Sequence, residues 1–158
     1  MKNTNRRVNR NLAIENAHIL WPNFAGKATQ FNQEGKRYFC VEIDKDIAEK
    51  LADEGWNIKM REPRDEGDDP MYYMQVSVSY DNIPPTIFVI THNGKSRLNS
   101  DTVDMLDWAE IVNVDLVISP YNWEVNGKHG VKAYLKSMYV VLFEDEFADK
   151  YADVPDAR

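Results

Sequence analysis

The segment VDLVISPYNWEVNGKHGVKAYLKSMYVV, residues 114–141, decides the fold class that this chain is expected to adopt. Apolar residues recur at every second position on both sides of its centre, which is the period of a strand with one buried face. At the centre stands Asn126-Gly127, the dipeptide that best tolerates the positive φ angles of a tight hairpin turn. We therefore predict two long antiparallel strands joined by this turn.

The predicted hairpin has an outer face that combines aromatic and basic side chains. In the first strand, residues 111–123, the inward set is Val112, Val114, Leu116 and Ile118, and the outward set is Ser119, Tyr121 and Trp123. Pro120 leaves the register of the outward set open, because proline cannot donate a hydrogen bond to the ladder. The return strand, residues 131–143, places Lys132, Tyr134 and Lys136 opposite Val131, Ala133 and Leu135.

Four further segments carry strand patterns bounded by turn-forming residues. Residues 37–43 direct Phe39, Val41 and Ile43 inward, which leaves Tyr38, Cys40 and Glu42 on the other side and the Cys40 thiol near or at the surface. Residues 71–80 bury their even positions and expose Tyr73, while residues 56–61 present Lys59 and Arg61 on a polar face. Residues 86–91 are apolar on both sides, which is typical of a central strand.

Two short helices interrupt these strands. Asp44 is a suitable N-cap and Gly55 a suitable C-cap, so we predict a helix over residues 45–54 with Ile47 and Leu51 on its apolar face. Ser100 caps a further turn or two in which Val103 and Leu106 face inward. Residues 62–70 form a charged loop. The patterns together indicate an all-β core with two inserted helices.

The composition fits one intracellular domain. With 158 residues and 43% hydrophobic content, the chain builds one core without help from metal or disulfides. A single cysteine excludes an internal disulfide, and the N-terminal MKNTNRRVNRN lacks the apolar stretch of a secretory signal. No run approaches the roughly 20 apolar residues that a membrane helix needs. We therefore expect a cytoplasmic protein.

Charge is distributed unevenly along the chain, whose net charge is −7. Residues 1–43 carry 7 Lys/Arg and 3 Asp/Glu, whereas residues 44–70 carry 5 and 10, and residues 71–143 carry 5 and 7. The tail EDEFADKYADVPDAR, residues 144–158, carries 2 and 6, and its few apolar residues predict disorder. The tail is either a solvated solubility segment, or an acidic arm that competes with a polyanion for a basic groove or recruits a partner.

Signals for catalysis are weak. The three histidines, His18, His92 and His129, lack the spacing of metal ligands. Two acidic clusters, one at residues 65–69 and one formed by Asp101, Asp104 and Asp107, are more typical of solvated surfaces than of magnesium sites. The chain contains neither a Gly-rich phosphate loop nor a nucleophile elbow. We predict no catalytic residues, no metal and no cofactor.

Aromatic residues interleave with cations at several places that an antiparallel barrel brings together. One group is Trp21, Phe24, Lys27 and Phe31, followed at once by Lys36, Arg37 and Tyr38. The predicted hairpin supplies Tyr121, Trp123, Lys128, Lys132, Tyr134 and Lys136. Single-stranded nucleic acid needs this pairing, because bases stack on aromatic rings while cations follow the phosphates. For any one ring, a place in the core is an equally good explanation.

The chain resembles the bacteriophage single-stranded DNA-binding proteins of the OB-fold type. The resemblance lies in IENAHILWPNF near the N-terminus, in the hairpin segment quoted above and in the acidic end. It implies a five-stranded Greek-key antiparallel barrel that binds ssDNA during replication, recombination and repair. It also implies that the tail contacts replication partners and covers the empty DNA groove. Here the tail ends in Ala157-Arg158 rather than in an apolar residue, which leaves Phe147 and Tyr151 as its anchors.

The resulting hypothesis is a nonenzymatic, sequence-independent ssDNA-binding protein. Its OB-fold domain spans residues 1–143 and its acidic tail spans residues 144–158. The predicted DNA-binding residues are Trp21, Lys27, Lys36, Arg37, Tyr38, Tyr121, Trp123, Lys128, Lys132, Tyr134 and Lys136.

Two alternatives stay open. One is a β-barrel module for protein–protein interaction or virion assembly, in which the exposed aromatic residues form a subunit interface. The other is a metal-dependent nuclease that uses Asp101, Asp104 or Asp107. The oligomeric state and the preference for DNA over RNA are not determined by the sequence.

Overall fold

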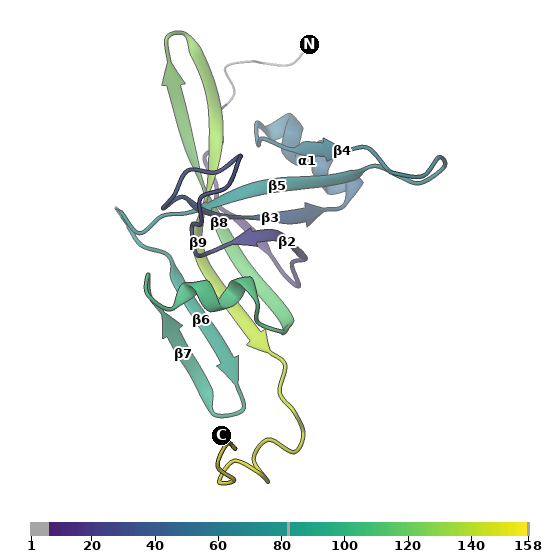
Figure 1. Cartoon of the computed structure of the whole chain (residues 1–158). Coiled ribbons are helices and arrows are strands. Elements are labelled where there is room, and N and C mark those ends of the chain that lie inside the picture. Colours follow the sequence, from purple (N-terminus) through teal and green to yellow (C-terminus); the bar gives the residue numbers. More distant parts are fainter. Residues whose placement is uncertain (1–6, 82, 158) are drawn as a thin grey trace.

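The computed structural model describes residues 7–81 and 83–157, and within them the chain is mainly β (Figure 1). Nine strands belong to one sheet, joined by one α-helix and one short 3-10 helix. The strands are β1 (Leu12–Ile14), β2 (Ile19–Asn23), β3 (Arg37–Ile43), β4 (Lys59–Arg61), β5 (Met71–Val78), β6 (Thr86–Thr91), β7 (Gly94–Leu98), β8 (Ile111–Val125) and β9 (Lys128–Leu142). The helices are α1 (Lys45–Glu54) and η1 (Val103–Asp107). The predicted mainly β class is confirmed.

The β8–β9 hairpin is the longest element and runs through the whole molecule (Figure 1). Each strand has 15 residues, and the register runs from Ile111↔Leu142 to Val125↔Lys128 at the tip. Asn126 and Gly127 both have positive φ angles, 52° and 78°, as a tight hairpin turn requires. The predicted hairpin and its turn are therefore confirmed.

The edge of β9 that faces away from β8 pairs with two different strands, one after the other along its length. β5 pairs with it in parallel at Val76↔Ala133 and Ser77↔Tyr134, and β6 pairs in parallel further along, from Thr86↔Ser137 to Ile90↔Val141. One limb of the sheet therefore continues through β5, β3 and β2, and the other through β6 and β7 (Figure 1). The sheet is open and mixed, an arrangement consistent with an OB-like fold. Its parallel pairs and its number of strands depart from the five antiparallel strands that we predicted.

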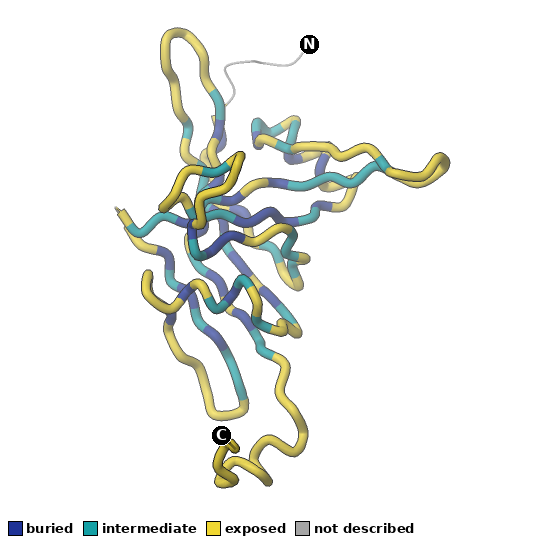
Figure 2. Tube along the Cα trace, in the orientation of Figure 1, coloured by how far each residue is buried: buried dark blue, intermediate teal, exposed yellow. Residues whose placement is uncertain are grey.

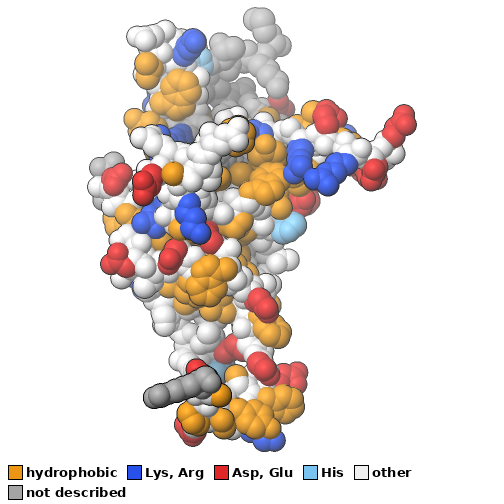
Figure 3. Space-filling view, in the orientation of Figure 1, with side chains coloured by type: hydrophobic (Ala, Val, Ile, Leu, Met, Phe, Trp, Pro, Cys, Tyr) orange, Lys and Arg blue, Asp and Glu red, His pale blue; other side chains and the backbone are white. Residues whose placement is uncertain are grey.

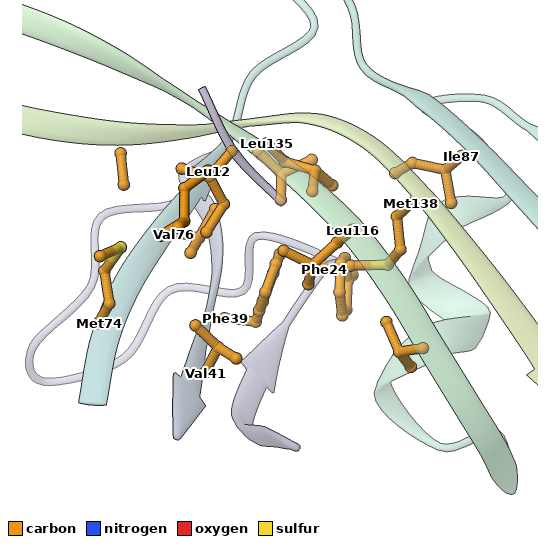
Figure 4. Packing of buried hydrophobic residues seen from close by; sticks show 14 of the residues in the cluster. Leu12, Phe24, Phe39, Val41, Met74, Val76, Ile87, Leu116, Leu135 and Met138 are labelled. Carbon is orange, nitrogen blue, oxygen red and sulfur yellow. The ribbon is translucent and has the colours of Figure 1, made fainter. Parts of the chain in front are cut away.

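The core lies between the two limbs and the β8–β9 hairpin, and the buried segments follow these strands (Figure 2). Phe24 and Phe39 stack with ring centroids 5.2 Å apart, and Leu116 and Met138 lie beside Phe24 (Figure 4). The predicted inward residues of β3 and β9 are buried, as are Met74, Val76 and Val78 of β5, whereas the predicted inward Tyr72 and Tyr80 are half-buried. Over residues 74–78 of β5 and 114–118 of β8, buried residues alternate with less buried ones, as the two-residue period requires.

Three predicted burial states are wrong. Val112 is 60% exposed, because the register shifts between Ile111 and Asn113. Ile47 is 49% exposed and Ala48 is buried in its place, so the apolar stripe of α1 is rotated by one residue. Cys40 is buried rather than near the surface, because Leu20 of β2 and Gln75 of β5, its directly opposed partners, project on the same side and flank it. Burial raises the pKa of the Cys40 thiol, and the nearby Lys59 cation partly opposes this shift.

Both predicted helical segments occupy their predicted places. α1 spans residues 45–54, with Asp44 at the N-cap and Gly55 in the left-handed conformation at the C-cap. The second segment is the 3-10 helix η1, with Thr102 rather than Ser100 at its N-cap. Val103 and Leu106 face inward as predicted.

The C-terminal tail, described here over residues 144–157, forms a series of turns beyond β9 and returns towards the β6–β7 turn (Figure 1). The side chain of Glu144 accepts a hydrogen bond from the backbone N–H of His92, and a second carboxylate, Asp149 Oδ2, lies 2.9 Å from His92 Nε2. The division into residues 1–143 and 144–158 stays a prediction, and residues 1–6, 82 and 158 of it lie outside the described residues. No helix of the described part is long and apolar enough to cross a membrane.

Asp107 joins η1 to the segment that follows β2. Its two carboxylate oxygens accept hydrogen bonds from the backbone N–H groups of Phe24, at 2.6 Å, and Ala25, at 3.0 Å. From the other side, the Arg37 guanidinium donates to the Phe24 carbonyl at 2.8 Å. These bonds satisfy polar groups beside the buried Phe24 ring and so stabilise its place in the core.

We predict that Asp107→Ala lowers the free energy of unfolding by about 1–3 kcal/mol, because two half-buried N–H groups lose a charged acceptor. Urea denaturation of the variant and of Asp104→Ala, an exposed neighbour on η1, measures this difference. Equal midpoints for the two variants would contradict the role of Asp107.

Candidate nucleic-acid interface

The outer face of the sheet carries one row of side chains across four strands. Tyr38 of β3 pairs with Ser77 of β5, Ser77 pairs with Tyr134 of β9, and Tyr134 pairs with Ser119 of β8. Directly opposed residues project on the same side of a sheet, with Cβ atoms about 5 Å apart. Their inward neighbours Phe39, Val76 and Leu135 are buried. The row therefore faces away from the core.

Two adjoining hollows lie on this face and share Gln75, Ser77 and Lys132 in their lining. The larger, of about 370 Å³, is also lined by Phe31, Asn32, Gln33, Lys36, Arg37 and Tyr38. The smaller, of about 150 Å³, is also lined by Asn57, Lys59, Met74, Val131 and Ala133. Lys36, Lys59 and Lys132 thus border a shallow polar floor formed by β5.

The base of the β8–β9 hairpin adds a cluster of rings and a cation. The rings of Tyr121 and Tyr134 meet edge to face with centroids 6.1 Å apart, and Lys132 Nζ lies 5.1 Å from the centroid of the Tyr134 ring. Tyr121 pairs directly with Lys132 across the two strands. Tyr121 is 56% exposed, so its ring is accessible to a ligand.

Trp123 lies over Gly130, its partner across the hairpin. A Cβ atom at residue 130 would stand 2.7 Å from the indole Cζ2 and 2.8 Å from Cε2. The missing side chain therefore lets the indole lie against the backbone, and 37% of Trp123 remains exposed. Gly130 therefore lets the Trp123 ring form an outward-facing aromatic surface near the tip of the β8–β9 hairpin.

A second aromatic group stands at the other end of β5. The ring of Trp21 meets Tyr73 edge to face at 5.1 Å, and the Arg61 guanidinium lies 5.4 Å from the centroid of the Trp21 ring. Trp21 has a φ of 46°, an uncommon conformation for a bulky residue, at the register shift between β2 and β3. Figure 3 shows Lys and Arg side chains beside hydrophobic ones at the base of the β4–β5 arm.

The structure brings most of the predicted residues to this face. Tyr38, Lys36, Lys132, Tyr134, Tyr121 and Trp123 lie along the row, the hollows and the hairpin, and Trp21 lies at the far end of β5. Lys128 is exposed at the hairpin tip, and Lys136 is exposed at the register shift of β9. Lys27 is exposed in the loop after β2 and lines neither hollow.

Arg37 differs from the other predicted cations. It shares the inward parity of Phe39, it donates to the Phe24 carbonyl, and its guanidinium lies 5.4 Å from the Tyr80 ring centroid. These contacts give Arg37 a role in the fold, and its side chain also lines the larger hollow. Burial raises the pKa of Tyr80, while Arg37 and Arg97 oppose that rise.

Sequence reasoning left out Lys59, Arg61, Tyr73 and Gly130, which also belong to this face. The sequence did indicate the first three residues, because the two-residue alternation placed Lys59, Arg61 and Tyr73 on the outward faces of their strands. Gly130 carried a weaker signal, since the hairpin register that opposes it to Trp123 follows only from the turn at residues 126–127.

His92 lies at the β6–β7 turn and has two acidic neighbours, Glu144 and Asp149. Its hydrogen bond to Glu144 raises the pKa of His92, and the charge of Asp149 adds to this effect. The same bond lowers the pKa of Glu144. The contact is complete while His92 is protonated and Glu144 ionised. It is lost as the pH rises through the raised pKa of His92, or falls through the lowered pKa of Glu144.

No cluster of three or more His, Cys, Asp or Glu residues suited to a metal ion exists within residues 7–81 and 83–157. Of the predicted acidic cluster, Asp107 is bound to backbone N–H groups and Asp101 and Asp104 are exposed.

Comparison with known proteins supplies a family match and a fold match. The model of the family described as "Putative phage ssDNA-binding domain" matches residues 1–158. No curated protein matches this chain significantly.

Among solved structures, the single-stranded DNA-binding protein from bacteriophage Enc34 superposes with a TM-score of 0.55 at 14% identity, covering 92% of this chain and 90% of the other. The same phage protein in complex with ssDNA gives a TM-score of 0.55 at 16% identity, covering 87% and 89%. These likenesses show the shared fold.

We predict that Gly130→Ala displaces the Trp123 indole, because the new methyl group would overlap it. Tryptophan emission should shift to longer wavelength and acrylamide quenching should increase, while the melting temperature changes little because residue 130 lies outside the core. His129→Ala is the matched control on the same arm. If Gly130→Ala no longer changes the emission when Trp123 is replaced by Phe, the change comes from the Trp123 indole. An unchanged spectrum for Gly130→Ala alone would contradict the packing of Trp123 against Gly130.

Proposed function

This chain belongs to the phage ssDNA-binding domain family, and on that premise we propose that it is a nonenzymatic, sequence-independent ssDNA-binding protein. The observation that carries the proposal is the outer face of β2, β3, β5, β8 and β9. There, accessible rings and exposed cations follow one another from Trp21 to Trp123. A face with rings alone would equally suit a protein partner.

In the proposed binding mode, aromatic rings bind the bases and cations bind the phosphates. Tyr38, Tyr121, Trp123 and Tyr134 offer stacking surfaces for unpaired bases, worth about 1–3 kcal/mol per base. Lys36, Lys59 and Lys132 border the hollows and neutralise phosphates. Because every base has a stackable face, such contacts discriminate little between sequences. A duplex keeps its bases paired and stacked, so it gains only the phosphate contacts.

The net charge of −7 is compatible with this mode because acidic residues concentrate elsewhere. The tail and the segment 44–70 carry 16 of the 26 Asp and Glu residues. Local potential at the binding face, rather than the net charge, determines the attraction of a polyanion.

We place an OB-type core within residues 1–143, formed by the contiguous run of strands β8-β9-β5-β3-β2. In this proposal the protein coats and protects ssDNA in the host cytoplasm during phage replication, recombination and repair. Residues 144–158 form the acidic tail, with Phe147 and Tyr151 exposed as anchors for replication or recombination proteins.

We predict that oligo-dT quenches the tryptophan fluorescence saturably, and that added salt reverses the effect because phosphate contacts release counterions. Tyr134→Ala should weaken binding by about 1–3 kcal/mol through loss of one stacked base. Tyr151→Ala, which removes an exposed ring from the tail, is the matched control.

Mobility shifts of labelled oligo-dT and of a duplex of equal length complete this experiment. Absence of both quenching and a shift would overturn the proposed function. Salt-insensitive self-association without DNA affinity would favour a protein-interaction module.

The tail gives a second prediction of this function. Truncation after Phe143 removes 6 acidic and 2 basic residues, so it removes a net charge of −4. Oligo-dT affinity should rise about threefold or more at low ionic strength, and the gain should shrink as salt screens the tail. A truncated protein with equal or weaker affinity would rule out competition between tail and DNA.

A further inference from the structure

The limb formed by β6 and β7 has its own outward-facing pair of rings. Phe88 of β6 and Tyr139 of β9 are direct partners in the ladder, and their rings stack with centroids 5.7 Å apart and an interplanar angle of 18°. Ile87, Val89, Met138 and Val140, their neighbours along the two strands, are buried. Tyr139 is 40% exposed, so the stacked pair offers an accessible edge on the outer face.

Cations from β7 stand beside these rings. Lys95 Nζ lies 4.7 Å from the centroid of the Phe88 ring, and Arg97 pairs directly with Phe88. Both side chains share the outer face, because their neighbour Leu98 is buried against the core. Lys136 is exposed three residues before Tyr139 on the same strand. Acidic residues also border this limb. Asp115 is opposite Tyr139, and its Oδ1 already accepts hydrogen bonds from Asn16 N and Asn113 Nδ2. Glu144 and Asp149 of the tail contact His92 at the β6–β7 turn.

β9 connects this group to the interface described above. Tyr134 and Tyr139 both point outward from β9, and the register shift between Val117 and Ile118 keeps them on one side although five residues separate them. At about 3.3 Å per residue the two rings are roughly 16 Å apart along the strand, with Lys136 between them.

We propose that Phe88, Tyr139, Lys95 and Arg97 form a second ssDNA subsite, which receives the strand after it leaves Tyr134 and follows β9 past Lys136. The proposal rests on the proposed function. A polynucleotide fits better than a protein, because three cations, Lys95, Arg97 and Lys136, border the rings. The nearby carboxylates are engaged by other groups, Asp115 by Asn16 and Asn113, and Glu144 and Asp149 by His92. Along a single strand, bases that can stack alternate with phosphates whose charge must be neutralised. Rings and cations follow one another along this face in the same way.

The test compares short and long oligonucleotides. One OB-fold covers roughly 4–16 nucleotides, so oligo-dT of about 5 nucleotides lies at the short end of this range and oligo-dT of about 20 exceeds it. The double variant Lys95→Glu/Arg97→Glu should bind the long oligonucleotide at least about tenfold more weakly and the short one nearly as the wild type does. Its salt dependence with the long oligonucleotide should lose a slope of about 0.7 for each phosphate contact removed.

The charge control is Lys50→Glu on the exposed side of α1, which changes the net charge without touching the β6–β7 face. A ring series separates stacking from charge: Tyr139→Phe should keep long-oligonucleotide affinity, and Tyr139→Ala should lose about fivefold or more. Circular dichroism and melting curves check that each variant is folded.

Equal affinity of the double variant and wild type for the long oligonucleotide would overturn the subsite. So would an equal loss for both lengths, or a changed oligomeric state without a changed DNA affinity. Failure of the wild type to bind either oligonucleotide would instead overturn the proposed function. The two failures are therefore distinguishable.

Discussion

The backbone ladder of β9 is the constraint on which the rest of the structure depends. One edge of this strand is bound by β8 along nearly its whole length, and the other by β5 and then β6. Where strands pair with both edges of β9, at residues 133–134 and 137–141, each residue has a defined side, inward or outward, because the neighbouring strands hold its pleat. Shifting the register by one residue would bury Lys132 and Tyr134 and expose Ala133 and Leu135.

This constraint explains why the candidate interface is extended rather than enclosed. Its side chains come from adjacent strands and lie side by side on the sheet, and the hollows between them are shallow surface features lined by Gln75, Ser77 and Lys132. Long charged side chains beside rings keep their ammonium groups in water while their stems cover apolar surface. Such a surface suits a flexible, linear ligand better than a small molecule, which prefers a deep and largely apolar pocket.

Charge is segregated in space as well as in sequence. The acidic tip between β4 and β5 and the tail beyond β9 project away from the central parts of β3, β5 and β9 (Figures 1 and 3). These strands carry the row formed by Tyr38, Ser77 and Tyr134. At physiological ionic strength the screening length is about 8 Å, so the charges at the β4–β5 tip act only weakly on the row. The tail returns to His92, at the outer end of the β6–β7 limb, and its carboxylates are partly neutralised there.

The sequence by itself determined the strands with strong alternation, the Asn126-Gly127 turn, the bounds of α1 and the outward parity of Tyr38, Tyr121, Tyr134 and Lys132. Each of these depends on neighbours within a few residues, through the two-residue pleat or the φ preferences of Gly and Asn. The family resemblance seen in the same segments agrees with the family match.

Only the tertiary structure decided the parallel pairing of β5 and β6 with β9, the exposure of Val112, the burial of Cys40, the inward role of Arg37 and the opposition of Gly130 to Trp123. These features depend on which strand lies at which edge and on where a ladder shifts register. The free energy of such long-range pairing comes from contacts between residues far apart in the chain, which no local period encodes.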